Sequence, residues 1–417
     1  MVATHRPNGY PRVAITGMSV ISPVGIGLET FWSALINGTS GIRRIQAFDP
    51  SHLRVQIAGE VLDFDPTPYL SAKKQRQLER VSQFAAVGTH MAIKDAKLEE
   101  NTLRQESERI GVAIGTAFGG YDAMQRGVQD FMNGKRPSAF ALVASLTNMP
   151  TFYAAEAGFA TGHHLSITTA CAASTQAIGE GYEMIRRGRA EIAIVGGVES
   201  LITDYTIACF DSMTSLPRNY NDNPSAASRP FDADREGFVF SEGGAILILE
   251  SFEHALARDA RIYAEIVGYA SSDDIYHITS IDPKGKGIER AMRWALQDAQ
   301  INPEQIDYIN AHGTSTRTND PIETAAIKRV IGRHAPVNST KSMIGHALGA
   351  AGALEAVVCV LSIRDQMLHP TINYTTPDPD CDLDYVPNEA RSAKIDYALS
   401  NSLGLGGHNA SLIIAKV

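Results

Sequence analysis

Short runs rich in valine and isoleucine recur along the chain and alternate with longer segments of helical periodicity. The runs stand at residues 12–18, 109–117, 191–197, 245–251, 263–272, 308–313, 398–404 and 410–417. Such runs are typical of strands buried on both faces of a sheet. Segments between them, such as 287–300 and 352–366, place apolar residues at the helical period of about 3.6. The pattern therefore predicts an α/β fold.

A domain boundary is expected at residues 251–271, where a strand run ends, a charged helix follows and a new strand begins. We therefore assign 1–258 to an N-terminal half and 259–417 to a C-terminal half. The two halves are hypothesised to repeat one topology, although their sequences show no residue-level repeat. No linker or low-complexity tract separates them, which indicates shared packing rather than independent domains.

Composition excludes several classes of protein. The chain has 417 residues, of which 44% are hydrophobic and 20% charged, so it is neither disordered nor fibrous. A formal charge of -9 without long basic blocks disfavours a nucleic-acid partner. The four cysteines form no CxxC pair, which argues against a disulfide scaffold and a thiolate zinc site. With neither a signal peptide nor an apolar membrane span predicted, we expect a cytoplasmic chain and no membrane partner.

Cys171 is the one cysteine in a setting that suits chemistry. The stretch SITTACAASTQAIGEG, residues 166–181, reads as a strand end followed by a helix start, with small neighbours that leave room for a ligand. Unpaired amides and the positive end of a helix dipole are expected to lower the pKa of this thiol. The other cysteines, Cys209, Cys359 and Cys381, are expected only to pack.

The C-terminal half supplies candidate partners for a nucleophile. His312 is predicted at the tip of a strand, and Lys341 and His346 at the start of a helix. A glycine-rich turn is predicted within residues 400–412, between two strands. Histidines are more often structural than catalytic, and the sequence predicts surface or loop positions for His52, His254 and His369.

Four motifs resemble those of the elongating β-ketoacyl-acyl carrier protein synthases, closest to type II, within the thiolase-like condensing enzymes. They are TACAAST (169–175), NAHGTSTRTND (310–320), KSMIGHALGAAGALE (341–355) and NSLGLGGHNASL (401–412). The resemblance covers essentially the whole chain in one order. It implies a thiolase-like fold of two similar βαβαβαββ halves in a five-layered αβαβα arrangement, with a dimer formed through the N-terminal half.

The resemblance also implies a reaction, the decarboxylative condensation of an acyl-enzyme with malonyl-acyl carrier protein in fatty-acid biosynthesis. Cys171 would carry the acyl group, and His312 and His346 would hold the malonyl thioester oxygen. Lys341 would support the histidines, and the amides of Cys171 and Leu405 would form the oxyanion hole. No metal or organic cofactor is expected, because decarboxylation itself generates the carbanion; the phosphopantetheine arrives on the carrier protein.

The resemblance implies further site residues, and several of them also have a purely structural interpretation. Glu323 would orient Lys341, although Asp320, Pro321 and Glu323 also read as N-cap, N1 and N3 of a helix. Thr314 and Thr316 would bind the phosphopantetheine arm, although Gly-Thr-Ser-Thr is also turn chemistry. The residues expected to line the substrate pockets are Phe118, Phe210, Leu403 and Leu405.

Two departures from the family pattern concern the substrate. Leu403 and Leu405 stand where family members usually carry phenylalanine, the second of which gates the acyl and malonyl pockets. Phe118 stands where many long-chain members have a smaller residue, so its volume would shorten or reroute the acyl pocket. Candidate residues for docking the carrier protein, each of which is alternatively a solvated surface charge, are Lys73, Lys74, Arg76, Arg80, Lys135, Arg136 and Arg218.

Other functions stay open at this point. The leucines and Phe118 favour, as an alternative, a ketosynthase of a type II polyketide or polyene pathway, active as a heterodimer with a non-catalytic homologue rather than as a homodimer. A degradative thiolase would need a second cysteine in the glycine turn, and an initiating synthase would have asparagine in place of His346. A non-catalytic scaffold that binds the carrier protein would have an unreactive Cys171.

Overall fold

The computed structural model describes residues 3–417, and ten of its strands form two sets of five with one topology. The first set runs β6-β5-β7-β8-β1 and the second β11-β10-β14-β15-β9. In both, the first three strands are parallel and the last two pair antiparallel. The strands are β1 (Val13–Ser22), β5 (Ile110–Gly115), β6 (His164–Ile167), β7 (Ile192–Glu199), β8 (Gly243–Ser251), β9 (Ala264–Asp273), β10 (Tyr308–Asn310), β11 (Val337–Asn338), β14 (Tyr397–Leu403) and β15 (His408–Ala415).

The two sets meet where β1 pairs antiparallel with β9 over Val13–Ile15. The topology therefore repeats, as hypothesised, although the sequence shows no repeat. The boundary placed at 258/259 falls in the connection between α10 (Phe252–Ala257) and β9.

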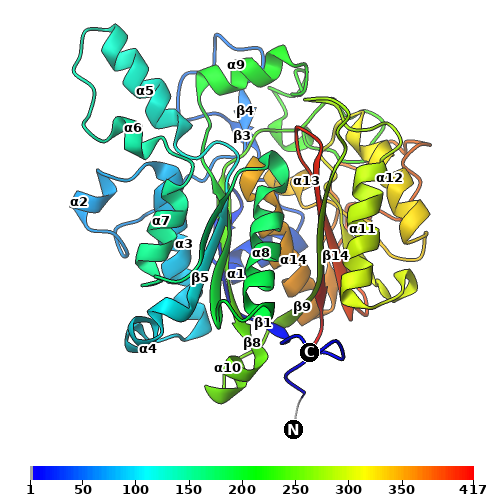
Figure 1. Ribbon diagram of the computed structural model, residues 1–417. Helices are drawn as coiled ribbons and strands as arrows, with labels where there is room; N and C mark the ends of the chain where they lie inside the picture. Colours follow the sequence, from blue (N-terminus) through cyan, green and yellow to red (C-terminus); the bar gives the residue numbers. More distant parts are fainter. Residues whose placement is uncertain (1–2) are drawn as a thin grey trace.

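The helices form three layers around these strands (Figure 1). α3 (Arg80–Ala96) and α7 (Met149–Ala157) cover the outer face of the first set, and α11 (Lys286–Ala299) and α12 (Asn319–Val330) lie outside the second. α8 (Ala173–Arg186) and α14 (Ala351–Asp365) lie between, and each contacts strands of both sets. This order of layers confirms the thiolase-like αβαβα fold.

Residue composition explains the central layer. α14 is mainly apolar all round, with Glu355 as its one charged residue among those buried, as expected for a helix covered on every side. α8 approaches its sheet through glycines; a Cβ on Gly181 would lie 2.1 Å from Cγ1 of Val195. The predicted strands agree with the structure because valine and isoleucine fill both faces: every residue of β5, β7 and β8 is buried.

The remaining elements are short or peripheral. They are β2 (Gly25–Ile26), α1 (Leu28–Ile36), β3 (Arg43–Arg44), β4 (Ile57–Ala58), α2 (Ala72–Gln75), α4 (Glu100–Gln105), α5 (Tyr121–Met132), α6 (Ala141–Ala144), α9 (Asp204–Ser212), α13 (Lys341–Ile344), β12 (Met367–Leu368), β13 (Arg391–Ser392) and the 3-10 helices η1 (Ser107–Arg109), η2 (Ala170–Ala172), η3 (Pro224–Ala226), η4 (Pro303–Gln305) and η5 (Leu348–Ala350). Within residues 3–417, no helix combines the length and hydrophobicity needed to cross a membrane.

Candidate active site

The site lies at the carboxyl ends of equivalent strands in the two halves. Cys171 follows β6, and Lys341 and His346 follow β11, which is the counterpart of β6. The buried helices α8 and α14 then begin next to Cys171 and His346. The carboxyl ends of strands are where α/β folds commonly build sites.

Cys171 sits in a strained turn at the predicted helix start. It belongs to η2, directly before α8, and Ala170 before it has φ 50°, in the left-handed region. Strain of this kind persists where surrounding structure holds it, often at functional positions. Gly404 lies against the same turn: a Cβ there would be 2.8 Å from Thr169 O and 3.3 Å from Cys171 N. The glycine is therefore needed for the close approach of the two turns.

The expected lowering of the Cys171 pKa is not what the structure indicates. Burial raises the pKa of this thiol to about 11, against the opposing charge of Lys341 and a hydrogen bond from the Leu405 backbone amide. The free-energy cost of removing the thiolate from water is larger than the stabilisation that the helix start gives to its charge. The free site therefore holds a thiol at neutral pH.

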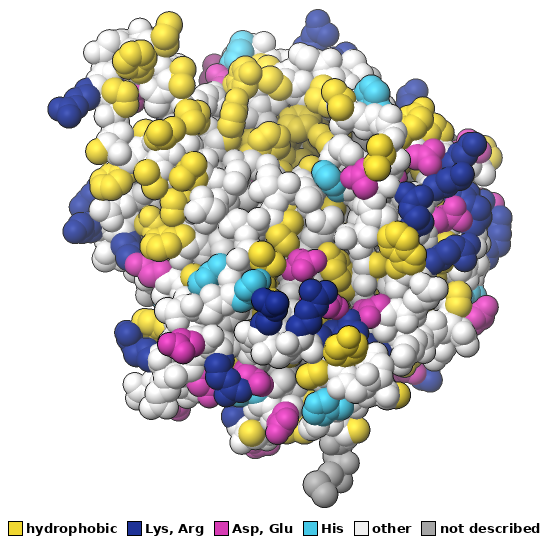
Figure 2. Space-filling view, in the orientation of Figure 1, with side chains coloured by type: hydrophobic (Ala, Val, Ile, Leu, Met, Phe, Trp, Pro, Cys, Tyr) yellow, Lys and Arg dark blue, Asp and Glu magenta, His cyan; other side chains and the backbone are white. Residues whose placement is uncertain are grey.

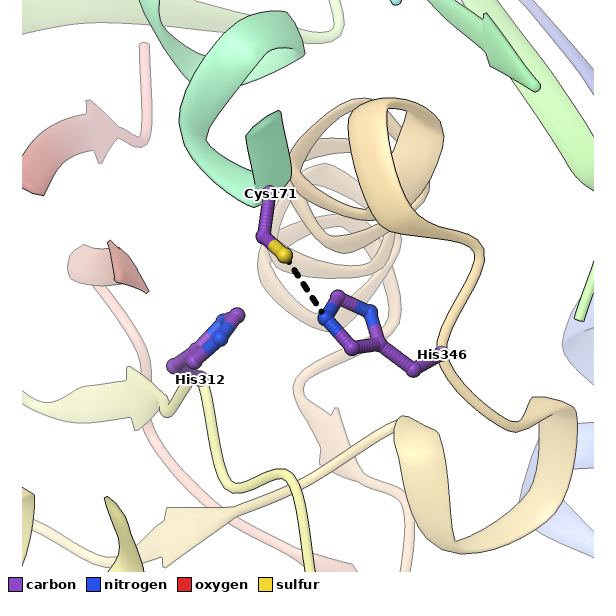
Figure 3. Close-up of side chains that lie close together, drawn as sticks. All are labelled: Cys171, His312 and His346. Atoms are coloured by element: carbon purple, nitrogen blue, oxygen red, sulfur yellow. Dashed lines mark hydrogen bonds between the residues drawn. The ribbon is translucent and has the colours of Figure 1, made fainter. Parts of the chain in front are cut away.

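His346 and His312 face the cysteine (Figure 3). His346 Nε2 lies 3.1 Å from Cys171 Sγ, and the two imidazole rings are edge to face with centroids 5.2 Å apart. Burial, together with the charge of Lys341, lowers the pKa of both histidines well below its usual value. Both rings are therefore neutral, so each carries one N–H and one acceptor nitrogen.

Lys341 sets the tautomer of His312. Its Nζ lies 3.3 Å from His312 Nδ1 and donates to the His312 carbonyl oxygen at 2.7 Å. An ammonium has no acceptor, so Nδ1 must accept and the ring proton must sit on Nε2. His312 therefore presents an N–H donor on its remaining nitrogen.

Glu355 was not predicted from the sequence, and it forms the ion pair with Lys341. Both side chains are buried, and burial raises the pKa of Glu355 to about 7 against the charge of Lys341. The sequence did contain a signal for this ion pair: Glu355 stands inside the apolar segment GALEAVVCVL, where a charged residue needs a buried partner.

The role predicted for Glu323 is corrected. Its two carboxylate oxygens accept hydrogen bonds from the backbone amides of His312 and Gly313, at 2.8 and 2.9 Å. It holds the loop that carries His312, whereas Glu355 pairs with Lys341.

The N-cap prediction for Asp320 is also wrong. Helix α12 begins at Asn319 with Thr318 as N-cap, and no cap hydrogen bond from the Thr318 side chain is present. Asp320 is buried, accepts from the Phe231 amide at 2.9 Å and lies 3.6 Å from Arg235. These tertiary partners outweigh the local capping pattern.

A cavity of about 480 Å³ opens onto the cysteine and both histidines. On the face shown in Figure 2, hydrophobic side chains surround a hollow below α9. The predicted residues Thr314, Thr316, Phe210, Leu403 and Leu405 all line the cavity. Leu403 is buried, whereas Leu405 is 36% exposed and stands at the mouth.

Phe118 does not line this cavity, contrary to prediction. It packs beside it, against the cluster of buried residues that includes Cys171 and Phe210. Buried Glu199 fixes this segment by accepting from the amides of Ala117 and Phe118, at 2.6 and 3.2 Å.

The seven docking candidates have different surroundings. Arg80 is half-buried and donates hydrogen bonds to Glu242 and the Val61 carbonyl oxygen, so its docking role stays a prediction. Lys74 pairs with Glu156, Lys135 with Asp130 and Arg218 with Asp211 at the surface, while Lys73, Arg76 and Arg136 are exposed. Arg218 also lines a second pocket with His52 and Arg54, and Thr214 belongs to both pockets. Arg218 therefore lies beside the cavity that holds the cysteine.

Among the residues expected to be structural, two predictions are wrong. Cys359 and Cys381 are buried as expected, but Cys209 is exposed. His52 lies in an exposed turn and His369 in a loop, as expected. His369 is fully buried there, with Nε2 3.0 Å from Thr340 Oγ1 and Nδ1 2.9 Å from the Pro370 carbonyl oxygen. His254 lies instead in helix α10, mostly buried between Glu250 and Glu106.

Comparison with known proteins agrees with this geometry. The β-ketoacyl synthase N-terminal domain matches residues 11–255 and the C-terminal domain residues 263–375. The chain is 46% identical to 3-oxoacyl-[acyl-carrier-protein] synthase 2 of Synechocystis sp., over 97% of this chain and 98% of that protein. It is 44% identical to the protein of the same name from Staphylococcus aureus, over the same shares.

Solved structures resemble the chain over nearly its whole length. The ishigamide ketosynthase/chain length factor superposes with a TM-score of 0.91 at 36% identity, over 98% of this chain and 100% of that chain. A type II PKS ketosynthase, solved with its acyl-carrier protein and bound to the hexaketide, gives 0.90 at 37% identity over the same shares. Both domains match in order and relatives align over nearly the full length, so this chain belongs to the β-ketoacyl synthase family.

Proposed function

We propose that this chain is a β-ketoacyl-[acyl carrier protein] synthase that lengthens an acyl chain by two carbons in fatty-acid biosynthesis. The observation that carries the proposal is the position of Cys171 Sγ, 3.1 Å from His346 and beside His312, at the base of a cavity. One nucleophile and two imidazoles suit transfer of an acyl group followed by stabilisation of a negative oxygen. The names of the relatives support the same reaction.

The first step loads the enzyme. Cys171 Sγ attacks the acyl thioester carbonyl, the carbon–sulfur bond to phosphopantetheine breaks, and the thiol proton passes by way of His346 Nε2 to the departing thiolate. The amides of Cys171 and Leu405 hold the oxyanion; the Leu405 amide already bonds the cysteine sulfur. A pKa of about 11 for the thiol makes this relay necessary, because little thiolate exists beforehand.

The second step generates the carbon nucleophile. The malonyl thioester would enter along Thr314 and Thr316, which line the cavity and would supply hydroxyl partners for the phosphopantetheine arm. Its carbon–carboxylate bond breaks, carbon dioxide leaves, and the electron pair moves onto the thioester oxygen. His312 and His346 donate N–H groups to this oxygen, and Lys341 keeps the His312 donor in place.

The third step forms the carbon–carbon bond. The enolate carbon attacks the acyl-cysteine carbonyl, the carbon–sulfur bond breaks, and Cys171 leaves as a thiolate that takes up a proton from water. The products are carbon dioxide and the extended β-ketoacyl thioester. The electron pair comes from decarboxylation, so we propose that the reaction needs no metal or organic cofactor.

The proposed partner is an acyl carrier protein in the cytoplasm. Arg218 lies beside the cavity, and Lys135 and Arg136 are exposed, so these cations can meet an acidic carrier surface. Arg218→Ala should raise KM for acyl carrier protein and leave KM for a free acyl-pantetheine unchanged. An equal effect on both substrates would contradict the docking role.

We also propose a homodimer formed through the N-terminal half. Strand β6 is an edge strand with alternately exposed residues. Large hydrophobic side chains are exposed on the α5–α6 segment of the same half, including Phe131, Met132, Phe140 and Leu142 (Figure 2). An open edge and an apolar patch of this kind favour burial against a second chain. Sedimentation of the purified chain alone as a monomer would contradict the proposal.

The likeness to solved polyketide enzymes favours a second candidate, a ketosynthase of a type II polyketide or polyene pathway paired with a non-catalytic homologue. Leu405 at the cavity mouth leaves more room than an aromatic residue. Condensation should be compared with saturated and polyunsaturated acyl carriers. Efficient elongation of long saturated chains supports fatty-acid synthesis, and a requirement for polyunsaturated chains or a partner chain supports the second candidate.

The direct test of the proposed function is condensation by the purified chain. With acyl and malonyl carrier proteins, the wild type should release carbon dioxide and form the β-ketoacyl product, and Cys171→Ala should form none. Absence of product with every acyl carrier, in a folded wild-type protein, would overturn the proposal in favour of a scaffold.

A further inference from the structure

Three atoms with affinity for soft cations converge at the base of the cavity. Cys171 Sγ and one ring nitrogen from each of His312 and His346 lie within 4.8 Å of one another, and all three residues are buried. A thiolate and two imidazoles form a set that binds Zn²⁺, with bonds of about 2.3 Å to sulfur and 2.0 Å to nitrogen. The donor atoms therefore need only small side-chain rotations to close around one ion.

Cys171 and His346 are ready to act as ligands. The Nδ1 atom of His346 is buried and has no hydrogen-bond partner among residues 3–417, so no neighbour fixes the ring proton on either nitrogen. The tautomer with the proton on Nε2 serves as the N–H donor of the proposed reaction, and the tautomer with the proton on Nδ1 leaves a free lone pair on Nε2, which faces the sulfur at 3.1 Å. The thiol would give up its proton to solvent as a sulfur–metal bond forms.

His312 is held in the wrong tautomer for a metal. Because Lys341 Nζ faces Nδ1 at 3.3 Å, the proton sits on Nε2, the nitrogen left for the cavity. A metal requires the lone pair of that nitrogen. Moving the proton to Nδ1 would place the N–H of the ring against the ammonium of Lys341, so that two hydrogen-bond donors would face each other. The ammonium of Lys341 also repels a cation at the neighbouring ligands.

We propose that Cys171, His312 and His346 form a latent site for a thiophilic divalent cation such as Zn²⁺, and that Lys341 keeps the ion out. Bound metal would occupy the nucleophile and block its acylation. Lys341 thereby protects the thiol in addition to positioning His312. The inference depends on the geometry of the free site and not on the substrate of the proposed reaction.

Cadmium is a suitable probe, because a cadmium–thiolate bond gives an ultraviolet charge-transfer band. The full chain is titrated with Cd²⁺ as wild type, Lys341→Met and the double variant Lys341→Met/Cys171→Ala, with Zn²⁺ as competitor. Lys341→Met should bind one ion per chain more tightly than wild type by roughly ten- to a hundred-fold, the size of effect that outer-shell partners have on metal affinity. The double variant should show no band.

Two controls make the result decisive. Lys341→Arg keeps a positive N–H donor and should remain as weak a binder as wild type. Circular dichroism shows which variants are folded, and Lys341→Ala replaces Lys341→Met should the latter fail to fold. Equal cadmium affinity in wild type and the uncharged variant would overturn the role of Lys341, and the absence of a Cys171-dependent band in that variant would overturn the site.

Discussion

At the scale of single residues, the site depends on one buried cation. Lys341 contacts His312 through both its ring and its carbonyl oxygen, and Glu355 neutralises it within the core. An unpaired charge in such a place would be strongly destabilising. The tautomer of His312 therefore depends on a residue in α14 that does not itself reach the cavity.

Loss of either histidine should separate the two half-reactions. His312→Ala and His346→Ala remove N–H donors to the enolate oxygen, so malonyl decarboxylation should fall by about 10²- to 10³-fold in each. Cys171 should still accept an acyl group, more slowly in His346→Ala because that residue relays the proton. Carbon dioxide release and intact-protein mass measure the two steps, and decarboxylation at the wild-type rate would contradict the assignment.

Glycine at position 404 should be necessary for activity rather than for folding. A Cβ there meets Thr169 O at 2.8 Å and would push the 404–407 turn, with the Leu405 amide, away from Cys171. Gly404→Ala should lower kcat about tenfold or more, in line with weakening one oxyanion donor. A melting temperature within a few degrees of wild type, measured on the same sample, shows that the fold is intact; unchanged kcat would contradict the role of this turn.

At the scale of elements, two buried helices explain how the halves form one site. α8 and α14 each contact strands of both sets and begin at the catalytic turns, so the packing between the halves positions Cys171 relative to His346. Glycines permit the close contact between α8 and its sheet.

Enlarging one of these glycines should destabilise the protein. A Cβ on Gly181 would lie 2.1 Å from Val195, and overpacking of this kind costs about 1–3 kcal/mol. Gly181→Ala should therefore lower the free energy of unfolding in denaturant titration. Gly127→Ala in α5 is the matched control, since its Cβ makes an ordinary 3.4 Å contact, and it should be neutral or stabilising. Equal stability of both variants would refute this account of the helix packing.

At the scale of the whole molecule, the sequence predicts the secondary structure and the catalytic turns better than it predicts the contacts of individual side chains. The valine-rich strands and the turns that carry Cys171, His312 and His346 can be predicted from the sequence because local composition determines them. The repeated topology cannot be predicted, because the two halves build it from unrelated side chains. Glu355, the partners of Asp320 and Glu323, and the burial of His369 depend on contacts distant in the chain. The raised thiol pKa likewise depends on tertiary burial that the local helix start does not reveal.

Stability of the whole chain should depend on pH through His254. Hydrogen bonding to Glu250 raises the pKa of His254, which also lies 3.1 Å from Glu106. Because the folded pKa is higher than the unfolded value of about 6.5, this contribution is present below that value and lost as pH rises through the folded pKa. The difference in unfolding free energy between wild type and His254→Gln should therefore shrink with rising pH, and a difference independent of pH would contradict the ion pair.

The central claim is that Cys171 carries the acyl group that is then condensed. The most direct measurement is intact-protein mass spectrometry with peptide mapping, first after acyl carrier protein is added and then after malonyl carrier protein is added. We predict one acyl group per chain on Cys171, which disappears as β-ketoacyl product and carbon dioxide appear together. An acyl group on another residue, or one that persists on Cys171 while product forms, would contradict the claim.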